Sequence, residues 1–127
     1  MKEQVLSVSQ MEELVNLGID VSKASMCWIV TRSGVQFLIP NKKDSILEDI
    51  LENEYLIDSY TPTFTLQDIL EMLPDIIVNH EVYIPVIQKN FCKYVHNDNP
   101  ILHLEVANNT IEAAFNMLKW CKQNNYI

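Results

Sequence analysis

Apolar side chains recur at helical spacing in several segments of the chain, the first two of them in its N-terminal half. The first segment covers residues 10–17, where Ser9 and Glu12 have the spacing of a capping box and Gly18 supplies a left-handed end. The second covers residues 45–53, which fit a helix better than a strand because their apolar and acidic side chains fall on opposite sides. Two helices are therefore expected before the middle of the chain.

A third helix is expected over residues 66–73, and it has the clearest start and stop signals. Thr65 and Asp68 have the capping-box spacing, and Pro74 blocks extension of the helix. Phe64, just before the cap, is placed to pack on Ile69 as a hydrophobic staple.

The last helix is expected over residues 111–123, with Asn109 or Thr110 as its cap. Its apolar surface is unusually broad, because Met117 and Trp120 widen the core stripe well beyond one face. A helix of this kind is either sandwiched inside the domain or shared with a second subunit. The first is the ordinary outcome, and the second makes a homodimer the alternative.

Runs of β-branched and aromatic residues, separated by turn chemistry, predict about five strands. Pro85 lies inside one run and indicates an edge strand or a bulge there. Residues 60–63 read as a loop. The expected strands cover residues 26–31, 36–39, 82–88, 91–96 and 101–106, and the first two are joined by a hairpin turn at 32–34.

These elements predict an α+β fold: one layered domain over residues 1–127, with a mainly antiparallel sheet of about five strands. Three to four helices gather on a face of the sheet, and the C-terminal helix is central. The length of 127 residues suits a single domain with a sizeable core.

Negative charge is concentrated in one part of the chain. Ten of the 17 acidic residues lie between Asp44 and Glu81, where there is no Lys or Arg. Such a field repels nucleic acid and attracts basic surfaces. We therefore expect a basic protein as partner and no nucleic acid, with Glu48, Asp49 and Glu52 as candidate partner-binding residues. A merely solvated acidic surface is the alternative.

Catalytic, cofactor-binding and metal-binding residues are not expected, and no cofactor is assigned. Two glycines are too few for a phosphate-binding loop. Cys92 and His96 would lie about 13 Å apart on a strand, too far to share a zinc ion. The three cysteines are odd in number and widely spaced, which indicates free thiols in a reducing cytosol. No apolar run approaches the length of a membrane span, so a cytoplasmic protein without membrane contact is expected.

Three parts of the chain resemble small uncharacterised proteins carried by phages and mobile elements of gut bacteria. They are residues 17–26 (LGIDVSKASM), residues 62–74 (PTFTLQDILEMLP) and the C-terminal part, residues 113–121 (AAFNMLKWC) with 125–127 (NYI). The resemblance implies a genomic setting of accessory genes that act on host or phage proteins. It implies no activity and no functional residue.

Three strands followed by residues 110–114 (TIEAA) and an apolar helix are also similar to HicB-type antitoxins. In that family a sheet-plus-helix domain blocks a basic ribonuclease toxin, a role that would suit an acidic chain. The leading interpretation remains a non-enzymatic interaction protein, such as an accessory, inhibitor or immunity-type factor with an acidic binding face. A small enzyme that uses a cysteine or carboxylate site is the other alternative.

Overall fold

The computed structural model describes residues 5–41, 57–97 and 100–127. Within these ranges there are three α-helices: α1 (Val8–Asn16), α3 (Leu66–Met72) and α4 (Thr110–Gln123). The strands of the same ranges are β1 (Met26–Thr31), β2 (Gln36–Pro40), β3 (Ile57–Thr63), β4 (Ile77–Asn79), β5 (Glu81–Gln88), β6 (Phe91–Val95) and β7 (Ile101–Val106). The helix expected over residues 45–53 lies outside the described residues.

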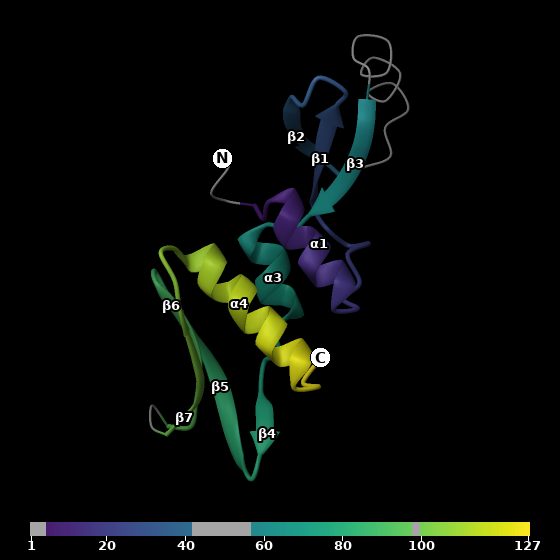
Figure 1. Cartoon of the computed structure of the whole chain (residues 1–127). Coiled ribbons are helices and arrows are strands. Elements are labelled where there is room, and N and C mark those ends of the chain that lie inside the picture. Colours follow the sequence, from purple (N-terminus) through teal and green to yellow (C-terminus); the bar gives the residue numbers. More distant parts are fainter. Residues whose placement is uncertain (1–4, 42–56, 98–99) are drawn as a thin grey trace.

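The strands form two antiparallel sheets, of order β2-β1-β3 and β4-β5-β6-β7. The two sheets lie at opposite ends of the described part, with the helices between and beside them (Figure 1). The α+β class and the antiparallel pairing are confirmed, whereas the expectation of one sheet with about five strands is wrong. The error comes from β3 and β4, which carry little of the apolar alternation that marks a strand in sequence.

Helix α1 begins earlier than its pattern predicted. Ser7, not Ser9, is the N-cap, and its hydroxyl accepts a hydrogen bond from the backbone N–H of Gln10. The Gln10 side chain in turn accepts from the backbone N–H of Ser7, which completes the capping box without Glu12. Gly18 takes a φ of 87° just after the helix, as expected for a left-handed end.

Helix α3 begins and ends as its signals predicted. Thr65 caps it and shares a capping box with Asp68. Leu73 is already extended, with a ψ of 137°, because the following Pro74 disfavours helical backbone at that position. Phe64 and Ile69 are both buried in the core cluster.

Strand β3 includes the residues that were expected to form a loop. Among the described strands it pairs with β1 alone, and Pro62 lies opposite Cys27 in that register. An edge strand tolerates proline because no second partner needs its missing N–H. The turn chemistry of residues 60–63 therefore misled the sequence prediction.

Strands β5 to β7 match their predicted ranges to within one residue at each end. Strand β4, with three residues, was too short to give a signal. It pairs with residues 81–83 of β5 only, so Pro85 lies on a part of β5 that has an open edge on one side, in agreement with the expected edge position.

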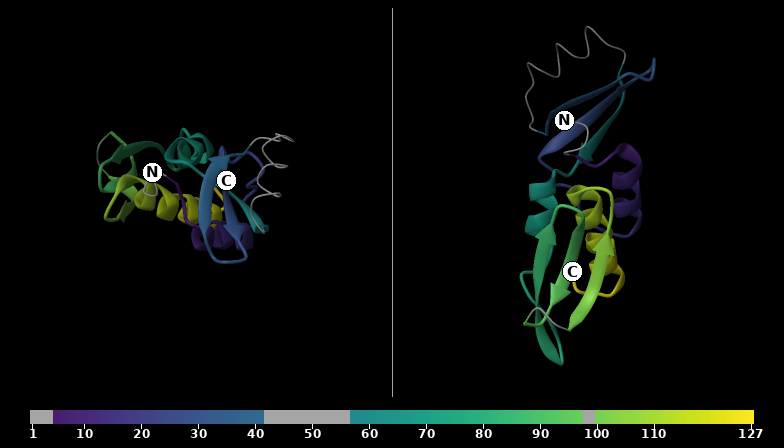
Figure 2. Two further views of the ribbon diagram at one scale, coloured as in Figure 1. Left: turned by 90° about the horizontal axis from the view of Figure 1, so that it is seen from above. Right: turned by 90° about the vertical axis from the view of Figure 1, so that its left-hand side faces the viewer.

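Helix α4 lies between the four-stranded sheet and the other helices. It packs against α3 on one side and against β5, β6 and β7 on the other (Figures 1 and 2). Met117 is fully buried, and Trp120 is half-buried. The broad apolar surface of this helix is therefore core, and Met117 is not available for a second subunit.

Candidate protein-interaction face

The four-stranded sheet has an inner face against α4 and an outer face on the opposite side. Its registers place Val78 beside Val82, Ile84 beside Val95 and Val86 beside Lys93, with side chains alternating between the two faces along each strand. The inner positions include the buried Ile77, Tyr83, Cys92 and Tyr94. The outer face consists of Val78, Val82, Ile84, Val86, Gln88, Phe91, Lys93, Val95, Ile101, Leu104 and Val106.

The outer face is apolar at nine of these eleven positions. Six of its aliphatic side chains are between 43% and 67% exposed: Val78, Val82, Ile84, Ile101, Leu104 and Val106. An antiparallel sheet with one solvated face normally alternates apolar and polar positions. Here both faces are apolar, which is the composition of a sheet that is covered on both sides.

Only one charged side chain belongs to the outer face. Lys93 lies on β6, and its Nζ is 5.3 Å from the centre of the Phe91 ring, a cation–π arrangement. The carboxylates of the sheet are engaged elsewhere: Glu105 is on the inner face, bonded to His103, and Glu81 pairs with His96 at 3.4 Å. The face is therefore nearly free of charge in an acidic chain.

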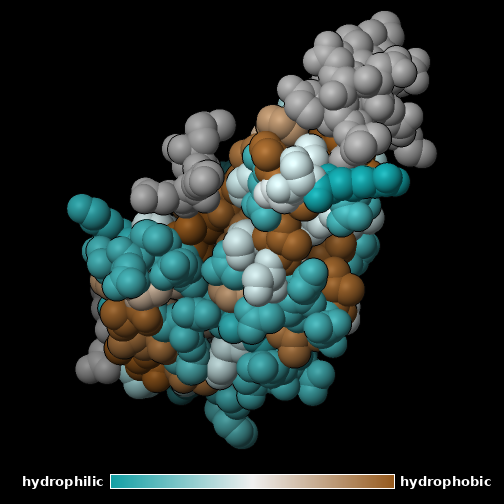
Figure 3. All heavy atoms as spheres, turned by 45° about the horizontal axis from the view of Figure 1, so that its top comes forward, coloured by the Kyte–Doolittle hydropathy of each residue, from teal (hydrophilic) through white to brown (hydrophobic). Residues whose placement is uncertain are grey.

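Within the described ranges, no helix or strand covers this face. In the right-hand view of Figure 2 the four strands lie in front of α4, with their outer side toward the viewer. Figure 3 shows hydrophobic side chains gathered at the lower left, on the side where this sheet lies in Figure 1. Most of the outer face is thus open to solvent in the single chain, whereas Val95, next to the register shift of β6, is buried with 1% exposed.

The sequence prediction missed this face, although the sequence carried a signal for it. Residues 82–87 (VYIPVI) are apolar at both odd and even positions, whereas a half-buried strand is apolar at every second position. Such a run is typical of a strand with two covered faces.

The acidic candidates Glu48, Asp49 and Glu52 lie outside the described residues. Of the acidic residues between positions 57 and 81, Asp58, Glu71, Asp75 and Glu81 are exposed. Asp68 is buried and accepts hydrogen bonds from Ser25 and Thr65, so it belongs to the packing of α3.

The three cysteines are free and buried. Burial raises the pKa of Cys27, and it raises the pKa of Cys92 to about 12 and that of Cys121 to about 11. Because the thiolate is the nucleophile, these side chains are poorly suited to covalent catalysis at neutral pH. His96 binds the Val82 carbonyl oxygen through Nδ1 at 2.9 Å and faces Glu81, so it is not paired with Cys92.

No three His, Cys, Asp or Glu side chains of the described residues are grouped so that they could hold a metal ion. The part of the chain that the structure describes also has no helix long and apolar enough to cross a membrane.

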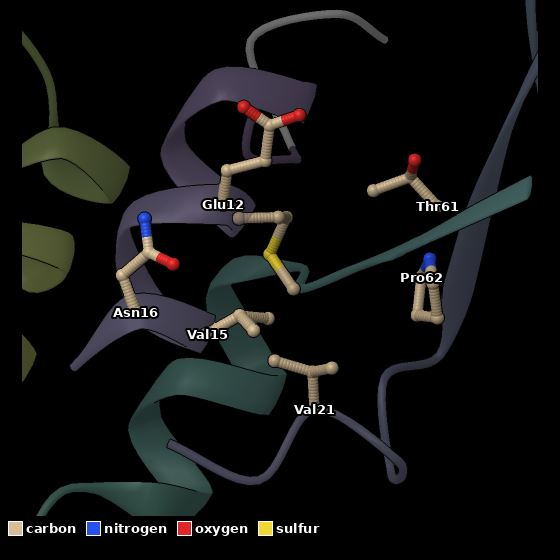
Figure 4. Close-up of a pocket in the computed structure, with 7 residues that line it drawn as sticks. Glu12, Val15, Asn16, Val21, Thr61 and Pro62 are labelled. Carbon is tan, nitrogen blue, oxygen red and sulfur yellow. The ribbon is translucent and has the colours of Figure 1, made fainter. Parts of the chain in front are cut away.

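A shallow cavity of about 240 Å³ lies between α1 and β3 (Figure 4). Its polar side chains, Glu12, Asn16 and Thr61, stand apart around an apolar lining. Two other hollows, of about 300 and 270 Å³, lie beside Trp28 and beside Asp68. None of these three cavities is lined by a cysteine or a histidine.

Comparison with protein-family models, with curated proteins and with solved structures gives no match.

Proposed function

We propose that this chain is a non-enzymatic protein-interaction protein and that the outer face of its four-stranded sheet is a binding surface. One observation carries the proposal: nine of eleven outward positions on this sheet are apolar, and six of these nine side chains are 43–67% exposed among the described residues. The largest apolar patch of a soluble monomer is typically about 300–600 Å² and often marks an interaction site.

The exposed apolar area of the outer face provides a driving force for binding. Covering apolar surface is favourable by about 25 cal/mol per Å². Val78 and Val106 are each 67% exposed in the single chain. A partner that covers these two side chains therefore removes much of their apolar surface from water. A nearly uncharged sheet face is also easily matched by another apolar surface.

The described thiols and cavities support this role over a small enzyme. Cys27, Cys92 and Cys121 are buried thiols with raised pKa values. The one buried carboxylate of the described residues, Asp68, is committed to helix capping. The three free thiols are also the reason to place the protein in a reducing compartment, the cytoplasm.

The acidic stretch adds a second element to the proposal. Its field would steer a basic protein toward the chain, and Glu48, Asp49 and Glu52 remain the candidates for that contact. An accessory, inhibitor or immunity-type factor acts by binding, and these two surfaces are sufficient for binding. A HicB-like antitoxin would be one case of the same function.

The test compares the native size of three variants in extracts of the cell that expresses the protein. Val82 and Val35 are both 49% exposed, but Val82 lies on the outer face and Val35 lies outside it, next to the β1–β2 turn. Val82→Lys tests the face, and Val35→Lys is the matched control. We expect wild type and Val35→Lys to migrate as part of an assembly larger than the 14.7 kDa chain. Val82→Lys is expected to migrate as a single chain. If all three run as single chains, the proposed function is wrong.

A further inference from the structure

We propose that a second copy of this chain covers the outer face, so that two four-stranded sheets pack against each other around a two-fold axis. This inference rests on the proposed function and names the partner of the same surface. It is carried by the size of the face and by its lack of charge.

The size of the face suits a weak dimer. Four strands about 4.8 Å apart, with about six residues at about 3.3 Å each, give a face of roughly 400 Å² in projection. Two such faces in contact remove on the order of 1,000 Å² of accessible surface, near the lower limit for a specific interface of about 1,200–2,000 Å². Interfaces below this limit are typical of weak, transient contacts, and we expect a dissociation constant on the order of micromolar.

The charge of the face favours a second copy over a basic partner. The chain carries a net charge of −8, yet no carboxylate of the described residues belongs to the outer face. A basic surface would find no counter-charge there, whereas a second copy presents an equally uncharged apolar face. Like-charge repulsion between two acidic chains is also smallest across the surface from which the acids are missing.

The geometry of the face allows the same surface to meet itself. A two-fold interface requires one patch to be self-complementary, and a face of aliphatic side chains with almost no charge can meet a copy of itself without unpaired carboxylates. Two antiparallel sheets pack face to face at about 10 Å. The dimer would then have four layers, with the two β4–β7 sheets inside and α4 with α3 on the outside of each.

Lys93 gives the dimer a distinctive prediction. It is the one charged residue of the outer face, and the two-fold axis brings two such side chains into the same interface. Lys93→Met removes this like-charge pair and is expected to tighten the dimer several-fold. A partner with a carboxylate that pairs with Lys93 would instead no longer bind the Lys93→Met variant.

Sedimentation velocity on the purified full chain tests the inference over a concentration range that spans the micromolar region. Wild type and Val35→Lys are expected to shift from monomer to dimer together. Val82→Lys and Val106→Lys are expected to raise the dissociation constant by at least about tenfold, because each buries an unpaired charge. Thermal melting by circular dichroism of each variant shows that the fold is kept.

A wild type that stays monomeric at the highest concentration would overturn the second copy as occupant. A dimer that Val82→Lys and Val106→Lys leave unchanged would also overturn it, since the contact would then lie elsewhere. A dimer that Lys93→Met weakens would overturn the face-to-face packing, in which the two Lys93 side chains repel each other. The proposed function is judged separately, by the assembly in cell extracts, so a purified monomer that joins a Val82-dependent assembly would refute only this inference.

Discussion

Ser25 and Asp68 are joined by two hydrogen bonds, although 43 positions separate them in the chain. The backbone N–H of Ser25 donates to the carboxylate at 2.9 Å, and its hydroxyl donates to the other oxygen. The backbone N–H of Thr65 donates to the same carboxylate at 3.0 Å. Asp68 thereby caps α3 and ties it to the start of β1.

The first prediction concerns this carboxylate. Asp68→Asn should lower the free energy of unfolding by about 1–3 kcal/mol at pH 7, because an amide cannot accept all three hydrogen bonds. Urea denaturation measures the change. Glu71→Gln, on an exposed position of the same helix, is the control and should stay within about 0.5 kcal/mol of wild type.

The same substitution should change the pH dependence of stability. Partial burial alone would raise the pKa of Asp68, but the hydrogen bonds from Ser25 and Thr65 outweigh it and lower the pKa. The contribution of Asp68 is therefore complete above the unfolded pKa of about 3.9 and is lost as the pH falls through the lower folded pKa. The difference between wild type and Asp68→Asn should shrink in acid, and a difference that grew below pH 4 would contradict the account.

The second prediction concerns the core around α4. Ala114 is fully buried on this helix, so Ala114→Glu places an unpaired charge among apolar side chains at a cost of several kcal/mol. We expect loss of soluble, folded protein on expression. Asn116→Glu is the control on the partly exposed side of the same helix and should fold. A cooperative melt of Ala114→Glu would show that the helix is misplaced.

The third prediction concerns the thiols. Cys27, Cys92 and Cys121 should react with a soluble disulfide reagent far more slowly in the native protein than in urea, because they are buried and their pKa values are raised. The release of the coloured thiol product at pH 8 measures the rate. One thiol that reacts at the rate of the unfolded chain would reopen the enzyme alternative.

The fourth prediction concerns the acidic stretch, and it rests on the sequence alone. Replacing Glu48, Asp49 and Glu52 by Gln, Asn and Gln should slow association with a basic partner and flatten its salt dependence. Stopped-flow or surface-based kinetics on a basic protein recovered with the wild-type chain give the rate. Association at the wild-type rate in low salt would make these side chains a solvated surface only.

The sequence predicted those elements that carry strong local signals. The capping box at Thr65 and Asp68, with Pro74 behind it, fixed α3, and helical spacing fixed α4 almost to the residue. Strands β5 to β7 followed from apolar runs that are separated by turn residues.

The remaining elements depend on pairing that no local pattern records. Strand β3 is held by its register with β1 despite Pro62, and β4 is three residues held by β5. The sequence did not predict the candidate surface for a related reason, because an apolar position predicts burial. Only the assembled sheet shows that most of its outer side is not covered by other described residues. Local signals therefore gave the elements, whereas tertiary pairing decided the two sheets and the open face.

The most direct test of the central claim is photo-crosslinking from the outer face in the expressing cell. Benzoylphenylalanine is introduced in place of Val106, which is 67% exposed on β7, and in a control chain in place of Val35. Only a protein that covers the outer face can be captured from position 106. We predict a discrete adduct from position 106, at twice the chain mass if the partner is a second copy, and none from position 35. If irradiation gives no adduct from position 106, or gives equal amounts of adduct from both positions, the claim that this face binds protein is contradicted.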